Sequence, residues 1–247
     1  MTIAPPASET ASDPETDPET GPASPTDRDR APLRVTDRAL LADVRRLARL
    51  ADGIAAGTVA LGERRALAVG DWAERVCEAV RHRHESEEAV LWPVLERHAG
   101  RTLDLSGLRD DHVALRGLLG EVRRATRGMV GALLLRPIAV ASAEDFARIG
   151  RLARLLDELA ELLEEHRHDA ERELVGVLPR VPRADWLGAV RALHTGSPDP
   201  AFTAARAHVT AGPEDVAAVD AALGGRGLPG VLARRALRRR ERLVFGA

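Results

Sequence analysis

The sequence predicts an all-α fold, an up-and-down four-helix bundle with a C-terminal helical extension. Aromatic residues make up only 2% of the 247 residues and tyrosine is absent, so the core must consist mainly of Leu, Val and Ala. That composition favours helices, because strands are enriched in β-branched and aromatic residues. Four stretches also repeat apolar residues at steps of three and four. Four amphipathic helices joined by connections of modest length are typical of a bundle.

An acidic segment rich in Pro and Thr precedes the expected bundle. Residues 1–32 hold seven acidic residues against two arginines, and near-repeats begin at Asp13 and Asp17. Such a segment cannot bury enough apolar surface to offset the entropy lost on ordering. We therefore expect a disordered tail over 1–32, the bundle over 33–186 and the helical extension over 187–247.

The first helix is expected over about 36–56 and the second from Asp71 onwards. Gly57 is the expected C-terminal stop of the first helix, and Asp71 with Glu74 is typical of a helix start. Pro93 should kink the second helix, because it removes one backbone hydrogen bond. The apolar stripes are Leu40, Val44, Leu47, Ala51 and Ile54 in the first helix and Val76, Val80, Val90 and Val94 in the second.

Two serines mark the expected starts of the third and fourth helices. Ser106 is expected to cap the third helix, and Ser142 with Asp145 the fourth. The apolar stripes are Leu108, Leu115, Leu119 and Val122 in the third helix and Ile149, Leu152, Leu156, Leu159 and Leu163 in the fourth.

The C-terminal extension has a less regular pattern. Pro200 and Pro213 are expected to begin short helices, and residues 229–244 are expected to form a basic one. We interpret that last helix as one that faces solvent or covers the bundle with its arginine stems, rather than as a nucleic-acid-binding element. No nucleic-acid partner is therefore expected.

Ionisable residues occupy positions on the apolar stripes. They are Asp37 in the first helix, Arg83 and Glu87 in the second, His112 in the third and His166 in the fourth. Burial of one such group without a partner would cost several kcal/mol. The groups are therefore expected to meet one another or a cation, since bundle cores hold carboxylate and histidine metal sites. Each residue alone has an ordinary alternative, as a hydrogen-bonded core histidine, a solvated acid or a helix cap.

The segment 82–93, His-Arg-His-Glu-Ser-Glu-Glu-Ala-Val-Leu-Trp-Pro, resembles the second-helix motif of hemerythrin-like (HHE) proteins. Residues 108–112 are similar to the third-helix segment of that family, and residues 165–173 to its fourth-helix segment. Residues 238–246 resemble the trailing basic helix of bacterial members. The resemblance spans about 35–186 and, more loosely, the remainder of the chain. All 36 basic residues are arginines, which favours a G- and C-rich source genome of actinobacterial type.

The resemblance implies a non-haem iron centre, with a diiron pair as the family arrangement, because imidazole and carboxylate ligands suit iron. The ligands carried over are Glu87, His112, His166 and Glu171, with Asp37 as a further oxygen ligand. His84 and Glu88 stand four residues apart on a face about 100° round the same helix and form an alternative ligand pair.

The sequence departs from the family pattern at three positions. Asp37 and Arg83 stand where histidines align, and Ala170 stands where an acid aligns. A guanidinium is always charged and cannot bind a cation as a ligand. An inward-facing Arg83 would pair with Glu87 or Asp37 and replace the positive charge of the metal. A local rotation that brings His84 inward would instead preserve metal binding.

The resemblance implies an iron-binding protein that handles dioxygen or a small redox ligand in an oxygen, iron or redox response. One alternative is a metal-free bundle that serves as a scaffold or interaction module, with Arg83 in place of the metal charge. A second alternative is a diiron-type oxidative enzyme. The sequence assigns no catalytic residue, and it leaves enzymatic activity and the oligomeric state open.

Cysteine content and hydropathy bear on the cellular compartment. The single Cys77 excludes an intramolecular disulfide. No apolar run reaches the ~18 residues of a membrane span, and the N-terminus lacks the charged-then-apolar order of a signal peptide. We therefore expect a cytoplasmic protein without a membrane span.

Overall fold

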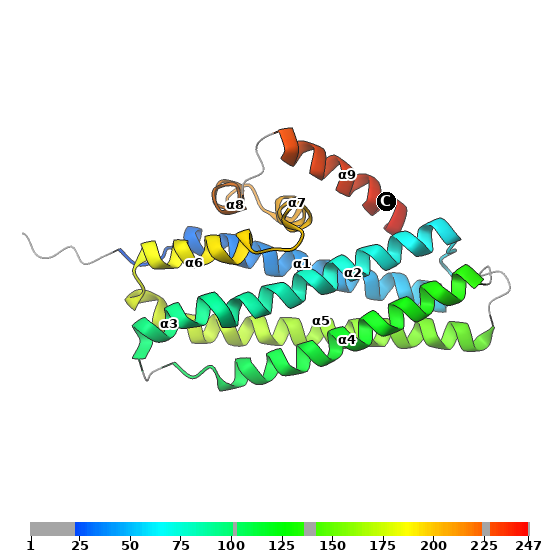
Figure 1. Cartoon of the computed structure of the whole chain (residues 1–247), viewed down its shortest axis with the longest axis horizontal. Coiled ribbons are helices and arrows are strands. Elements are labelled where there is room, and N and C mark those ends of the chain that lie inside the picture. The colour runs from blue at the N-terminus through cyan, green and yellow to red at the C-terminus, as the bar shows by residue number, and fades with distance from the viewer. Residues whose placement is uncertain (1–22, 101–102, 136–141, 224–227, 247) are drawn as a thin grey trace, which may run out of the picture.

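Four long helices run side by side and form the bundle (Figure 1). The computed structural model describes residues 23–100, 103–135, 142–223 and 228–246, and all regular structure within them is helical. The four helices are α1 (Asp27–Ala55), α2 (Glu63–Ser86), α4 (Ser106–Leu135) and α5 (Ala143–Val177). α1 packs against α2 and α5, and α4 packs against the same two helices. The predicted all-α bundle is confirmed.

α1 begins earlier than the sequence predicts. Thr26 and Asp29 form a capping box in which the Thr26 side chain accepts from the Asp29 backbone N–H and the Asp29 carboxylate accepts from the Thr26 backbone N–H. Arg183, distant in sequence, also binds Asp29, so a tertiary contact fixes this end of the helix. Residues 27–32 are therefore helical, although they fall within the expected tail, and residues 1–22 of that tail lie outside the described residues. The expected stop is confirmed, since α1 ends at Ala55 and Gly57 has a φ of 71°.

α2 also begins earlier than predicted, at Glu63 after the N-cap Gly62. Asp71, expected at its start, lies within the helix, where its carboxylate accepts from Arg75 and Arg240, each at 2.9 Å. The second helix continues through a π-helix, Glu87–Leu91, into α3 (Trp92–Ala99). The Trp92 backbone N–H donates to the carbonyl of Glu87, five residues earlier. The irregularity expected at Pro93 therefore takes the form of a π-helix immediately before it, a feature frequent at functional sites.

The starts of the other two bundle helices differ from each other. Ser142 caps α5 in a capping box with Asp145, as predicted. At α4 the backbone N–H of Ser106 donates to the carboxylate of Asp104 over 2.9 Å, so Asp104 supplies the side-chain acceptor there.

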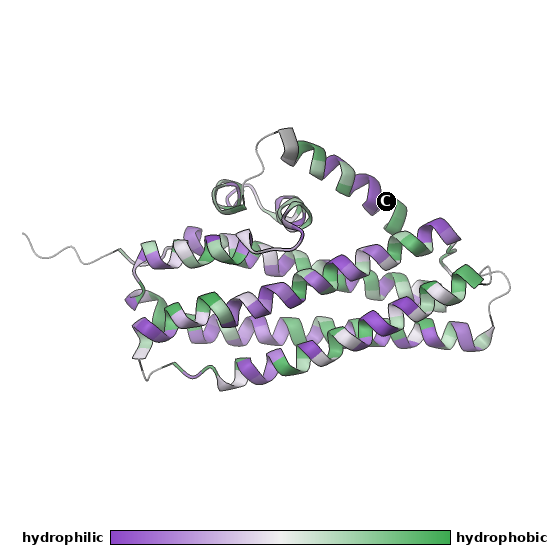
Figure 2. Cartoon of the chain, in the orientation of Figure 1, coloured by the Kyte–Doolittle hydropathy of each residue, from purple (hydrophilic) through white to green (hydrophobic). Residues whose placement is uncertain are grey.

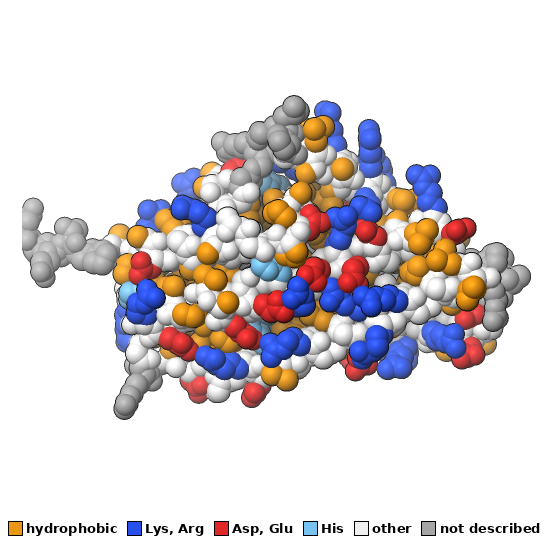
Figure 3. Space-filling model, viewed as in Figure 1, with side chains coloured by type: hydrophobic (Ala, Val, Ile, Leu, Met, Phe, Trp, Pro, Cys, Tyr) orange, Lys and Arg blue, Asp and Glu red, His pale blue; other side chains and the backbone are white. Residues whose placement is uncertain are grey.

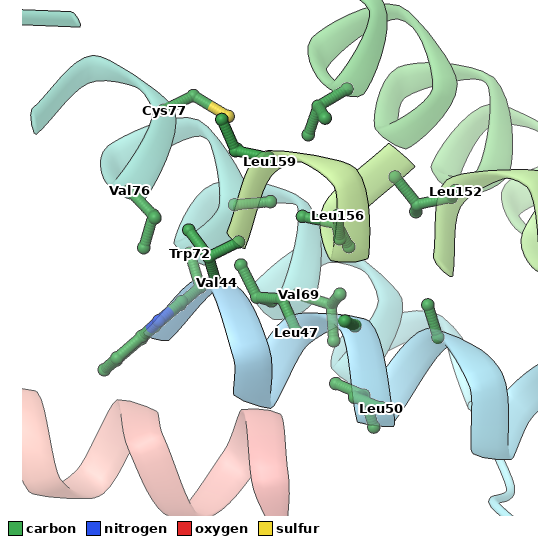
Figure 4. Close-up of a cluster of buried hydrophobic side chains, with 14 of the residues drawn as sticks. Val44, Leu47, Leu50, Val69, Trp72, Val76, Cys77, Leu152, Leu156 and Leu159 are labelled. Carbon is green, nitrogen blue, oxygen red and sulfur yellow. The ribbon is translucent and has the colours of Figure 1, made fainter. Parts of the chain in front are cut away.

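The bundle core is aliphatic, and Trp72 of α2 points from it towards the C-terminal extension, where it packs against Phe202 and Phe245 (Figure 4). Trp72 is fully buried, and Figure 2 shows hydrophobic and hydrophilic residues alternating around each long helix. Cys77 is 2% exposed, and burial raises the pKa of its thiol to about 12, which is consistent with an inert core side chain. Other buried members are Val44, Leu47 and Leu50 in α1, Val69 and Val76 in α2, and Leu152, Leu156 and Leu159 in α5.

The C-terminal extension packs on α1 and α2 (Figure 1). A 3-10 helix, Leu178–Arg180, leads from α5 into α6 (Arg183–Thr195), α7 (Pro200–Thr210), α8 (Val216–Leu223) and α9 (Leu228–Phe245). Pro200 begins α7 as predicted, whereas Pro213 precedes α8 by three residues. The boundary expected after Trp186 falls within α6. The basic helix α9 lies against the bundle through Leu237 and Val244, which are 7% and 0% exposed.

The exposed face seen in Figure 3 carries arginine and acidic side chains intermingled. Ion pairs form within α2 and between α2 and α4, including Arg81 with Glu78 and Arg123 with Glu74 and Glu78. Among the described residues, no helix combines the length and apolar character needed to cross a membrane.

Candidate metal centre

The interior of the bundle holds a group of three histidines and one glutamate. They come from four elements: His84 from α2, Glu87 from the π-helix, His112 from α4 and His166 from α5. One ligand atom from each lies within 4.8 Å of the others. None of the four residues is more than 8% exposed.

The carboxylate oxygen Oε2 of Glu87 has no hydrogen-bond partner although it is buried. It lies 3.4 Å from Nε2 of His112 and 3.5 Å from Nε2 of His166, and these two nitrogens are 3.3 Å apart. A buried carboxylate oxygen without a partner costs free energy. The oxygen and the imidazole nitrogens instead converge on one point, which is the arrangement that a bound cation would satisfy.

The Nδ1 atom of each imidazole binds an oxygen outside the group. The distances are 2.7 Å from His84 to the backbone oxygen of Val80, 2.7 Å from His112 to Glu88 and 3.1 Å from His166 to Asp111. Carbonyl and carboxylate oxygens accept hydrogen bonds, so each Nδ1 carries the proton. The Nε2 lone pair of a neutral imidazole is then free to bind a metal, and metal-binding histidines are held in this way by an outer acceptor.

The helix that carries Glu87 also fixes the ring of His112. Glu87 faces Nε2 of His112, and the next residue, Glu88, accepts from Nδ1 of the same ring. Trp92, at the start of α3, stacks on this imidazole with ring centroids 4.6 Å apart and planes 17° from parallel. The π-helix therefore begins with two consecutive residues that contact opposite nitrogens of one imidazole.

Arg83 occupies the side of the centre next to α1. Its Nε and Nη2 atoms donate to the two carboxylate oxygens of Asp37 over 3.0 and 3.2 Å. Its Nη1 atom lies 2.6 Å from Oε1 of Glu87. The guanidinium thus links two carboxylates, and the Glu87 carboxylate has one oxygen towards Arg83 and the other towards the histidines.

Burial and neighbouring charges set the protonation of the group. Burial opposes ionisation of Glu87, but Arg83 and the two facing imidazoles outweigh it and hold the pKa of Glu87 well below its ordinary value. Burial lowers the pKa of His84 to about 3, so its imidazole is neutral. Burial also opposes protonation of His166, yet Glu87 and Asp111 raise the pKa of His166 above its ordinary value. The centre therefore offers an ionised carboxylate and at least one neutral imidazole, the forms that bind cations.

A family model matches the part of the chain that builds this centre. It is the hemerythrin HHE cation-binding domain, and it covers residues 33–178, more than half of the chain. The chain belongs to the hemerythrin HHE family. Comparisons with curated proteins and with solved structures found no match. The family is one that binds cations, and the residues of this HHE domain fit a cation, because an unpartnered buried carboxylate oxygen lies among imidazole nitrogens.

The residues suggested by the sequence lie in different places in this HHE domain. His84 joins Glu87, His112 and His166 in the group. Asp37 binds the guanidinium of Arg83 and lies outside the group.

Glu171 also lies outside the group. Its side chain is 46% exposed and its carboxylate accepts from Arg167 over 2.9 Å. Five residues after His166 correspond to a rotation of about 140° round the helix, so the two side chains leave α5 in different directions, although both line one pocket between α1 and α5.

The outer partners of the histidines were not predicted. Asp111 directly precedes His112 on α4, yet it binds His166 on α5, so the contact depends on how the two helices are rotated. The sequence offers Glu88 as an alternative ligand with His84, whereas in the structure its carboxylate accepts from His112 and from Arg116. The sequence does carry a signal for these outer partners, because an acidic residue stands next to each residue of the group. Metal-binding histidines need an acceptor at their second nitrogen, and such an acid can supply it.

A pocket of about 260 Å³ leads to the centre between α1 and α5. Arg83, Glu87 and His166 line its inner end, and leucines of both helices line its walls. Ala170 of α5 also lines it. A small molecule that enters this pocket can therefore reach the centre of the HHE domain.

Proposed function

We propose that this HHE protein binds iron through His84, Glu87, His112 and His166 and uses it to bind or sense dioxygen or another small redox ligand. The observation that carries the proposal is the buried, unpartnered Oε2 atom of Glu87, which faces two imidazole nitrogens. Membership of a cation-binding family supports it independently.

The donor set favours iron over the hard cations. Three imidazoles and one carboxylate suit iron and other first-row transition metals, whereas calcium and magnesium prefer oxygen ligands. Bound iron would supply one-electron redox chemistry and a coordination position for a small ligand.

The chain supplies the surroundings of that iron. The side chains of the group are buried, and none of the four residues is more than 8% exposed. Glu88 and Asp111 hold two of the imidazoles in place. The pocket between α1 and α5 gives a small ligand access to the group.

Metal loading tests the cation site. The chain is loaded with Fe(II) under anaerobic conditions, dialysed and analysed for iron, and its thermal unfolding is compared with that of the metal-free chain. We expect near-stoichiometric iron and a stabilisation of about 2.7 kcal/mol when free iron is 100 times the dissociation constant. Iron below about 0.1 per chain without stabilisation on adding Fe(II) would contradict the proposal and leave the metal-free bundle.

Variants locate the site. His166→Ala removes a ligand and should abolish most of the bound iron. His98→Ala is the matched control, because His98 lies on α3 and binds Asp185 over 2.9 Å, outside the group. Equal iron content in the two variants would show that His166 is not a ligand of the iron.

Air exposure tests the redox part separately. The reduced, iron-loaded protein should change its near-ultraviolet absorption when oxygen is admitted and recover it when a reductant is added. If the spectrum of the loaded protein does not change with oxygen, nitric oxide or reductant, the proposed oxygen or redox role is contradicted and the proposed cation binding is not.

A further inference from the structure

We infer that the guanidinium of Arg83 occupies the place of a second metal ion, so that this HHE domain holds one metal ion rather than a pair. The inference rests on the proposed cation binding and deepens it, because it fixes the number of ions. It follows from the contacts of Arg83 with Glu87, which also faces the histidines, and with Asp37.

The carboxylate of Glu87 is placed as a bridge between two positive groups. Its Oε1 atom lies 2.6 Å from Nη1 of Arg83, whereas its Oε2 atom faces the imidazoles of His112 and His166. A carboxylate can bind two cations, one through each oxygen. Here one of the two positions is already filled by a cation that belongs to the chain.

The carboxylate of Asp37 is also bound to Arg83. Both of its oxygens accept from Arg83, which presents Nε and Nη2 in a planar fork that matches the two oxygens. A guanidinium stays protonated throughout the accessible pH range, and its covalent attachment prevents it from dissociating. The side chain of Arg83 is 9% exposed, so water does not screen its charge from an approaching cation.

The remaining ligands for a second ion are also absent from this side of the centre. Arg83 and Ala170 stand where the resemblance expects ligands, and Glu171 is paired with Arg167. A second ion here would lie against the guanidinium with both neighbouring carboxylates already engaged.

The charged groups that contact the ligands and their outer partners balance for one divalent ion. Four carboxylates contact the group or its partners: Asp37, Glu87, Glu88 and Asp111. Two arginines oppose them, because Arg83 binds the first two and Arg116 binds Glu88 over 3.0 Å. Two negative charges remain, and one divalent cation neutralises them. A second ion would leave two uncompensated positive charges in a buried site, which is costly.

Counting metal ions tests the inference directly. The wild-type chain is loaded with excess Fe(II) without oxygen, and its iron content is measured by elemental analysis and native mass spectrometry. We expect one iron per chain and, after oxidation, the electron paramagnetic resonance signal of an isolated ferric ion. In Arg83→His, where a neutral imidazole replaces the guanidinium, we expect the iron content to rise from one towards two per chain, with loss of that signal through coupling.

Arg81→His is the matched control. It also exchanges an arginine of α2 for histidine, but Arg81 binds Glu78 and Glu85 outside the centre and its side chain is 36% exposed. Its iron content should remain at one per chain. A rise to two in this variant would show that loss of positive charge alone, rather than the position of Arg83, sets the number of ions.

The outcomes separate this inference from the proposed function. Two irons in the wild-type chain would overturn the single-ion inference and leave iron binding intact, whereas no iron would overturn both. An Arg83→His variant with native circular dichroism that still binds one iron would show that Arg83 does not hold the second position. If that variant fails to fold, the wild-type stoichiometry and resonance signal decide the question.

Discussion

The Nδ1 atom of His112 donates to the carboxylate of Glu88 over 2.7 Å, while the Nε2 atom of the same ring lies 3.4 Å from Glu87. Two neighbouring residues therefore hold the two nitrogens of one imidazole, one inside the centre and one outside it. The outer contact fixes the tautomer and the orientation of the ring before any cation is bound.

Removal of that outer acceptor should weaken metal binding without removing a ligand. Glu88→Ala is expected to lower the affinity for Fe(II) by about 10–100-fold, the usual effect of losing an outer partner of a metal-binding histidine. A competition titration against a chelator measures it. Glu85→Ala, three positions earlier and 45% exposed in a pair with Arg81, should bind as the wild type does. Equal affinities of the two variants would show that Glu88 has no positioning role.

A buried ion pair connects the C-terminal extension to the bundle. Arg206 of α7 donates to Asp43 of α1 over 2.6 Å, and their side chains are 4% and 0% exposed. Arg206→Met should lower the free energy of unfolding by about 3–5 kcal/mol, because it removes the hydrogen-bonded partner of the buried Asp43 carboxylate and leaves only Arg46 at 3.8 Å. Urea unfolding measures this loss, and the double variant Arg206→Met/Asp43→Leu should recover most of it.

An exposed ion pair provides the control for that experiment. Arg45 and Glu164 link α1 and α5 with side chains 43% and 38% exposed. Arg45→Ala should cost about 1 kcal/mol or less, because water already screens the pair. A loss for Arg206→Met as small as that of the control would contradict the importance of the buried pair.

The pair between Asp29 and Arg183 predicts a pH dependence of stability. Arg183 donates to both oxygens of Asp29, over 2.7 and 2.8 Å, and holds the pKa of Asp29 below its ordinary value despite burial. A carboxyl group with a depressed pKa stabilises the fold above its unfolded pKa of about 3.9, and this contribution is lost as the pH falls towards the folded pKa.

The comparison is between the wild type and Asp29→Asn at several pH values. The wild type should unfold at a higher temperature at pH 7, and the difference should shrink as the pH falls below about 4. Asp27→Asn, whose side chain is 79% exposed, should change the unfolding temperature little. A difference for Asp29→Asn that stays constant down to pH 2 would show that ionisation of Asp29 does not stabilise the fold.

The helical periodicity of the apolar residues predicts most of the fold and three of the four residues of the metal-site group. Glu87, His112 and His166 fall on apolar stripes, and a stripe position predicts burial whatever the neighbouring helix is. His84 does not follow from the stripe of Arg83, since consecutive residues lie about 100° apart. The structure buries both, with Arg83 towards α1 and His84 within the histidine group.

Contacts between distant segments could not be obtained from spacing. The start of α1 depends on Arg183, which is 154 residues away from Asp29, and the partner of His166 is an acid on α4. A local signal also gave a wrong helix start. Asp71 has the sequence environment of an N-cap, but it lies within α2 and its carboxylate binds arginines of α2 and α9. Such pairings depend on the rotation and register of packed helices, which only the assembled bundle defines.

The pocket between α1 and α5 predicts a variant that separates ligand access from metal binding. Ala170 lines the pocket but lies outside the group of metal-site residues. Ala170→Phe should fill much of the space of about 260 Å³ and leave the iron content unchanged.

Stopped-flow measurement of nitric oxide binding to the iron-loaded, reduced protein tests this route. Ala170→Phe should slow association about tenfold or more, equivalent to an added barrier of about 1.4 kcal/mol. Val113→Phe adds the same ring at a position of α4 that is 61% exposed, and it should bind at the wild-type rate. Equal rates for both variants would mean that ligands reach the centre elsewhere. A slower rate in Ala170→Phe alone would assign the entry to the pocket between α1 and α5, because the small side chain of Ala170 leaves the space through which the ligand passes.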